Sequence, residues 1–128
     1  MGLSSKPFKT RVTKTGNCLE ELVADSQHLL TFTIPRMENQ EETIDLLNTK
    51  KNVMQQQHAS ITSAKLSLDA AVNSFEEVFD KLDDRSQQEE QASQEMYLNL
   101  AWDLITTAEA LLGKLAEKEI EISTTWRI

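Results

Sequence analysis

Residues that break or cross-link a chain are scarce in this sequence of 128 residues, which holds three glycines, two prolines and one cysteine. A β-sandwich needs frequent turns and β-branched runs, so this scarcity excludes that class and favours long helices. A single cysteine excludes an internal disulfide, and we therefore expect a reducing, cytoplasmic location. No apolar run approaches about 18 residues, so the sequence predicts neither a membrane span nor a signal peptide.

Acidic residues outnumber basic ones, and the formal net charge is −8. A chain this acidic is not expected to bind nucleic acid over its whole surface. The first sixteen residues are the exception, because they contain no acid and four basic residues: Lys6, Lys9, Arg11 and Lys14. We predict that this basic N-terminal region is either a solvated arm or a surface that contacts phosphate groups or lipid.

Apolar residues recur at alternating intervals of three and four along most of the chain, which is the pattern of a helical stripe. The elements predicted for this single domain, residues 1–128, are an N-terminal arm at 1–6, helices at about 7–32, 39–82 and 87–122, and a tail at 123–128. We expect short connections to make successive helices antiparallel, and so long a stripe favours shallow crossing angles. The fold class is therefore all-α, an antiparallel three-helix bundle with a long central helix and coiled-coil-like packing. Its predicted core residues are Leu68, Val72, Phe75, Phe79, Ile105 and Leu112.

Two pairs of residues are candidate capping boxes at helix starts, Asn39 with Glu42 and Ser86 with Glu89. In such a box, each side chain accepts a hydrogen bond from a backbone N–H that has no partner inside the helix. The segment HASITSA at 58–64 has low helix propensity, so a kink there is one alternative to a straight central helix.

The first predicted helix contains Gly16 and Asn17 in the middle of its apolar stripe. In one interpretation Asn17 is an N-cap paired with Glu20, and the helix begins at residue 18. In the other, the helix continues through Gly16 at a cost of about 1 kcal/mol. The unbroken stripe favours the continuous helix, in which the glycine lets a neighbouring helix approach closely. We predict that Cys18, beside the stripe, is a buried and inert thiol, because no histidine or basic pair is placed to activate it.

No motif in the sequence supports catalysis, a cofactor or a metal site. Glu21, Asp25 and His28 share one face of the first helix, but metal sites in helical bundles need further carboxylates and a second histidine motif. The glycines are isolated, so no phosphate-binding loop is present, and no serine lies in a nucleophile elbow. We therefore predict a non-catalytic protein without cofactor or metal, in which these three residues form a solvated face.

Three basic side chains interrupt the stripe of the long helix at intervals of seven: Lys51, His58 and Lys65. In one interpretation the stripe shifts sideways and these side chains extend to water. In the other they form a seam that binds an acidic partner, and their polar groups fix its register. The second interpretation makes them predicted partner-binding residues, together with Trp126. Trp126 follows Ile122 by four residues and is predicted to be either docked or an exposed contact.

The order of these features resembles that of a known family. A basic segment leads through an asparagine into a leucine-rich helix at Thr10, Thr13, Asn17, Leu19 and Leu22. After a long second helix, the third has an acidic lead-in and a tyrosine, at Glu89, Glu90, Glu95 and Tyr97. Over residues 6–116 this arrangement resembles the N-terminal helical region of Gag-like polyproteins of Bel/Pao-type retrotransposons. The resemblance implies an assembly or interaction element without catalytic residues. The chain departs from such polyproteins in having no Cys-His zinc knuckle and no Asp-Thr/Ser-Gly protease motif.

The sequence thus predicts a non-catalytic helical module for protein–protein interaction and assembly, which the resemblance connects with a retrotransposon Gag-like origin. We expect its partner to be a second copy or another helical protein, and we expect a homo-oligomer. The stripe of the second helix is predicted to be too long for the first helix to cover. The alternative function is peripheral binding to nucleic acid or membrane through the basic N-terminus, which four positive charges make less favoured.

Overall fold

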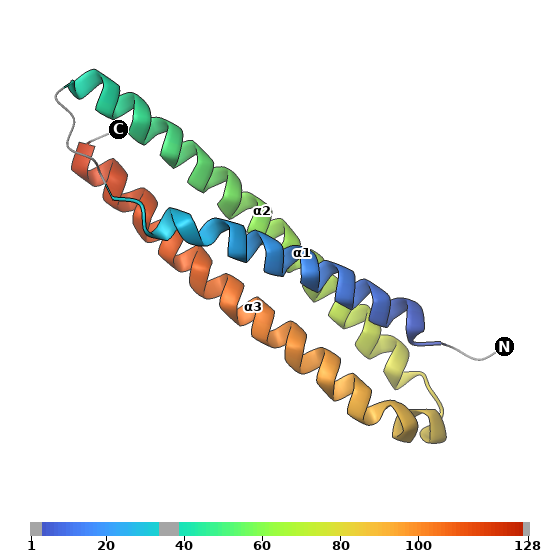
Figure 1. Cartoon of the computed structure of the whole chain (residues 1–128). Coiled ribbons are helices and arrows are strands. Elements are labelled where there is room, and N and C mark those ends of the chain that lie inside the picture. The colour runs from blue at the N-terminus through green and yellow to red at the C-terminus, as the bar shows by residue number, and fades with distance from the viewer. Residues whose placement is uncertain (1–3, 34–38, 127–128) are drawn as a thin grey trace.

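A computed structural model gives the structure of the chain for residues 4–33 and 39–126, with side chains as far as residue 124. Its helices are α1 (Lys6–Leu30), α2 (Gln40–Asp80) and α3 (Asp84–Trp126). Each helix packs against the other two, and α2 is antiparallel to α1 and α3 (Figure 1). The described residues therefore form a three-helix bundle, and the predicted all-α fold is confirmed.

Helix α1 continues through its central glycine, as the unbroken stripe predicts. It begins at Lys6 with a proline in the first turn, where the fixed backbone angle of Pro7 suits a helix. Asn17 is an exposed residue inside the helix and not its cap. Gly16 is buried, and a Cβ at this position would lie 3.3 Å from Leu104 Cδ1 of α3. The glycine therefore allows α1 and α3 to lie close together at this level.

Helix α2 is unbroken through 58–64, the segment with low helix propensity. Its N-cap is Asn39, whose side-chain oxygen accepts hydrogen bonds from the backbone N–H groups of Glu41 at 2.9 Å and Glu42 at 3.2 Å. The Asn39 half of the predicted capping box is therefore confirmed. The two glutamates also place negative charge at the positive end of the helix dipole.

The core of the bundle follows a single line of side chains along α2. Residues at intervals of seven are each 0% exposed: Leu47, Met54, Ile61, Leu68 and Phe75. We call these five residues the α2 line. Side chains of the other two helices, each at most 1% exposed, pack in the same core: Leu19, Leu29, Ala108, Leu115 and Ile122. Helix α1, with 25 residues, is too short to cover all 41 residues of α2, as predicted. Helix α3 covers the α2 line together with α1, so no second chain is needed to bury it.

Most of the predicted core is buried, with a shift on α3. Leu68, Val72, Phe75 and Ile105 are buried, whereas Phe79 and Leu112 are half-buried. Leu111 is buried instead of Leu112. The reason is that α3 packs against α1 as well as α2, and Leu111 lies two turns after Leu104, on the side that faces α1.

Helix α3 begins earlier than the sequence predicts. Its N-cap is Asp83, whose carboxylate accepts a hydrogen bond from the backbone N–H of Ser86 at 2.7 Å. The predicted cap at Ser86 is wrong, because an aspartate three residues earlier places a negative charge at the positive end of the helix. Hydrogen bonds from the backbone and side chain of Ser86 hold the pKa of the Asp83 carboxyl below its usual value.

Helix α3 also ends later than predicted, at Trp126. The tail predicted at 123–128 is therefore helical as far as 126, because neither glycine nor proline follows Ile122 to end the helix. Residues 127–128, the rest of that tail, lie outside the described residues. The same holds for residues 1–3 of the predicted N-terminal arm.

The two helical glycines give a matched test of the close approach at Gly16. We expect Gly113→Ala to raise the free energy of unfolding by about 0.5–1 kcal/mol, because alanine favours the helix and a Cβ there meets nothing within 4 Å. Gly16→Ala should gain less, because its Cβ would meet Leu104. Urea denaturation measures both variants, and an equal gain at the two sites would contradict the close approach.

Candidate interaction surface

The basic N-terminal region belongs to α1 and is not a loose arm. Lys9 is half-buried, and its Nζ lies 3.7 Å from a carboxylate oxygen of Glu90 and 5.8 Å from the centre of the Tyr97 ring, both on α3. The other basic residues of this region are exposed on the helix: Lys6, Arg11 and Lys14. Part of the positive charge that is predicted to contact phosphate or lipid is therefore neutralised by Glu90 of the same chain.

Glu90 connects the start of α1 to α3. Its carboxylate accepts a hydrogen bond from the hydroxyl of Ser5, a buried residue, and also lies beside Lys9. Because α1 has no acidic residue in its own first turn, Glu90 supplies the negative charge near the positive end of that helix. Ser5 and Glu90 are 85 positions apart, so no local pattern in the sequence indicates this contact.

Replacing Glu90 tests this connection. We expect Glu90→Gln to lower the free energy of unfolding by about 1 kcal/mol, because the side chain is only 31% exposed and faces both Ser5 and Lys9. The matched control is Glu89→Gln, whose side chain is 64% exposed and pairs with the exposed Arg85. That change should cost about 0.3 kcal/mol. Equal losses in urea denaturation would contradict the role given to Glu90.

The predicted partner-binding residues of α2 lie on its flank toward α3. Lys51, His58 and Lys65 are half-buried, and Lys65 Nζ lies 3.6 Å from a carboxylate oxygen of Glu109 on α3. At Lys65, the acid expected from a partner is supplied by the same chain. Trp126 is in the last turn of α3, and its side chain lies outside the described part of the chain.

Cys18 is exposed, so the predicted burial of its thiol is wrong. It lies at a groove between α1 and α2, between Lys14 and Leu22 of its own helix. The α2 side of this groove consists of small residues: Ala59, Ser60, Ser63, Ala64 and Ser67. Such short side chains leave the thiol uncovered.

The described residues offer no metal site and no membrane span. Glu21, Asp25 and His28 are exposed, as predicted for a solvated face. Within 4–33 and 39–126, no group of three or more His, Cys, Asp or Glu side chains is placed to hold a metal ion. Across the same residues, no helix combines the length and the hydropathy needed to cross a membrane.

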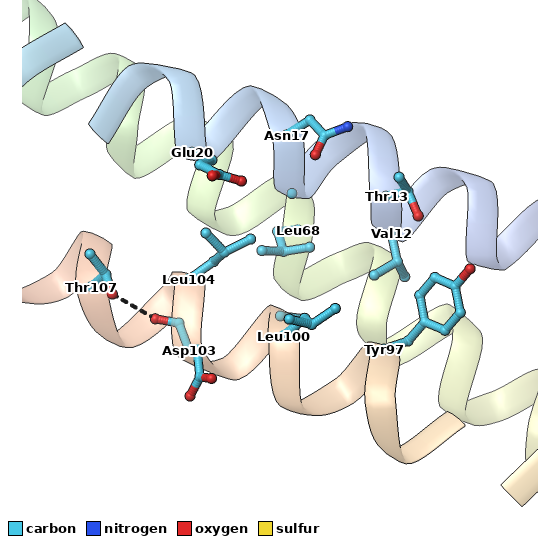
Figure 2. A pocket seen from close by; sticks show the side chains of 12 residues that line it. Val12, Thr13, Asn17, Glu20, Leu68, Tyr97, Leu100, Asp103, Leu104 and Thr107 are labelled. Atoms are coloured by element: carbon cyan, nitrogen blue, oxygen red, sulfur yellow. Dashed lines mark hydrogen bonds between the residues drawn. The ribbon is translucent and has the colours of Figure 1, made fainter. Parts of the chain in front are cut away.

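A groove of about 330 Å³ opens between α1 and α3 around Gly16. Figure 2 shows its apolar lining, which comes from all three helices: Val12, Leu68, Tyr97, Leu100 and Leu104. Its polar rim consists of Thr13, Asn17, Glu20, Asp103 and Thr107. Gly16 lies in the wall of this groove, beside Leu104 and Leu68.

One exposed apolar side chain of α3 lines this groove, and a second lies one helical turn before it, outside the lining. Leu100, which lines it, is 58% exposed, and Met96, one turn earlier, is 54% exposed. Leu100 is the one exposed large apolar side chain, among the described residues, that lines the groove; the others lie outside its lining: Val53, Leu66, Met96, Trp102 and Ile120. We define the α1/α3 face as Thr13, Asn17 and Glu20 of α1 with Met96, Leu100 and Leu104 of α3. A row of exposed apolar residues beside a groove is typical of a protein-binding surface.

None of the residues of this face is among those that the sequence analysis predicts to bind a partner. A signal for it exists, because Met96, Leu100 and Leu104 recur at intervals of four beside the core stripe of α3. Only the position of α1 reveals that this second row is left partly uncovered.

Comparison with protein-family models, with curated proteins and with solved structures finds no match to the chain.

Proposed function

We propose that the chain is a non-catalytic helical module for protein–protein assembly, which associates with a second copy of itself through the α1/α3 face. The observation that carries this proposal is the row formed by Met96 and Leu100, both more than half exposed beside an apolar groove. Covering apolar surface stabilises a complex by about 25 cal/mol per Å². Side chains in such a row therefore favour association.

The burial of the α2 line favours the α1/α3 face, and not the predicted seam on α2, as the surface of association. All five of its residues are buried within one chain, so α2 does not need a partner to complete its core. Lys65 on its flank already pairs with Glu109. Association through α1 and α3 then adds a contact between subunits that are already folded.

A self-associating module agrees with the resemblance to Gag-like polyproteins, whose N-terminal helical region is an assembly element. We include this origin in the proposal. We also place the protein in the reducing cytoplasm, where the exposed thiol of Cys18 remains free.

Binding of nucleic acid or membrane through the basic residues is less favoured. Glu90 faces Lys9 of the basic region, so a ligand would meet fewer positive charges than the sequence predicts. Binding of that kind weakens steeply with salt, whereas contact through an apolar row does not.

Light scattering across a range of concentrations tests the proposal. We expect the wild-type mass to rise from 14.5 kDa toward twice that value. Leu100→Arg should stay monomeric, because dimerisation would bury a guanidinium against apolar side chains. The matched control is Leu66→Arg, since Leu66 is 59% exposed on α2 and does not line the groove. It should behave as the wild type. A constant wild-type mass of 14.5 kDa, or equal effects of the two variants, would overturn the proposal.

A further inference from the structure

We infer that the two copies pair antiparallel about a two-fold axis that crosses the α1/α3 face at the level of Thr13 and Leu98. In this arrangement α1 lies along α1 of the second copy, and α3 lies along α3 of the second copy. The inference rests on the proposed function and adds its geometry.

The charges along the groove side of α1 are symmetric about Thr13. Thr13 and Glu20 line the groove, and Lys6 is an exposed residue two turns before Thr13, so all three share one side of the helix. Thr13 is therefore midway between a cation and an anion, each seven residues away. A two-fold interface repeats every contact. An antiparallel pairing centred on Thr13 places Lys6 of each copy beside Glu20 of the other.

The exposed apolar residues of α3 are symmetric about the same level. Contacts between the parallel helices have offsets from 81 positions, for Lys9 with Glu90, to 88, for Lys9 with Tyr97 and Gly16 with Leu104. The offsets of 85 between Ser5 and Glu90 and 86 between Phe32 and Lys118 lie near the middle of this range. An offset of 85 places Thr13 level with Leu98. Leu98 is midway between Met96 and Leu100, so the same axis brings Met96 of each copy against Leu100 of the other.

The remaining charges of this face are compatible with that axis. Asp103 on the rim of the groove is placed opposite Ser93 of the second copy, and Glu89 opposite Thr107. No two like charges are placed opposite each other among these pairs. The interface thus has an apolar centre on α3 and two ion pairs on α1, an arrangement in which the charges fix the register and the apolar contacts supply affinity.

Charge reversal tests the predicted ion pair. We expect Lys6→Glu and Glu20→Lys each to raise the dimer dissociation constant about 3- to 10-fold, because each places two pairs of like charges in the interface. The double variant restores opposite charges and should return to within about 2-fold of the wild type. Lys14→Glu with Glu21→Lys is the matched control, since these exposed residues do not line this groove. It should leave the constant within about 2-fold of the wild type.

Cross-linking tests the position of the axis. In a Cys18→Ser background, Thr13→Cys places two thiols at the axis, where the helices are close enough for a disulfide. We expect oxidation to give a covalent dimer. Lys6→Cys in the same background should not, because the two residues would lie about 20 Å apart along the helices.

The outcomes separate the two proposals. A wild-type dimer without rescue by the double variant, or without cross-linking through Thr13→Cys, overturns the geometry and leaves the assembly function standing. Cross-linking through Lys6→Cys also overturns the geometry. A wild-type chain that remains monomeric at every concentration overturns the proposed function itself.

Discussion

The burial of the α2 line is the constraint on which the other features of the bundle depend. Its five residues lie seven apart and none is exposed, so α1 and α3 must both lie against the same helix. Gly16 then lets α1 approach α3 closely, yet a groove remains uncovered beside Leu100. The same packing produces the buried core and the exposed face, because the contact of α3 with α2 determines which side of α3 remains exposed to solvent.

Polar contacts between helices fix how the apolar surfaces align. Ser26 is wholly buried, accepts a hydrogen bond from Gln57 Nε2 of α2 at 3.0 Å, and donates one to the backbone carbonyl of Leu22 at 2.7 Å. A slip of α1 along α2 would break the bond between Ser26 and Gln57 and leave the half-buried Gln57 amide without this partner, which costs about 1–3 kcal/mol. The contacts of Glu90 with Ser5 and Lys9 fix the alignment of α1 and α3 in the same way. These contacts hold the offset on which the symmetry of the α1/α3 face depends.

Local patterns in the sequence predict the features that depend on residues close together in the chain, such as helices and their caps. The spacing of apolar residues predicts three helices and the continuity of α1 through Gly16, and the position of Asn39 predicts the cap of α2. The sequence does not separate Asp83 from Ser86 as the cap of α3, because both are good cap residues and they lie within one turn of each other. The exposure of Cys18 depends on small residues of α2. The exposure of Met96 and Leu100 depends on the position of α1 against α3. Tertiary packing determines both exposures, and it depends on residues that are far apart in the sequence.

Hydrogen–deuterium exchange of the wild-type chain at low and high concentration reports on the burial of α2 and on the α1/α3 face in one experiment. We expect the amides around the α2 line to exchange slowly at both concentrations. At high concentration, additional protection should appear in α1 around Thr13 and in α3 around Leu98. Additional protection centred on α2, with α1 and α3 unchanged, would contradict the claim that the core of this chain is complete and that its partner binds elsewhere.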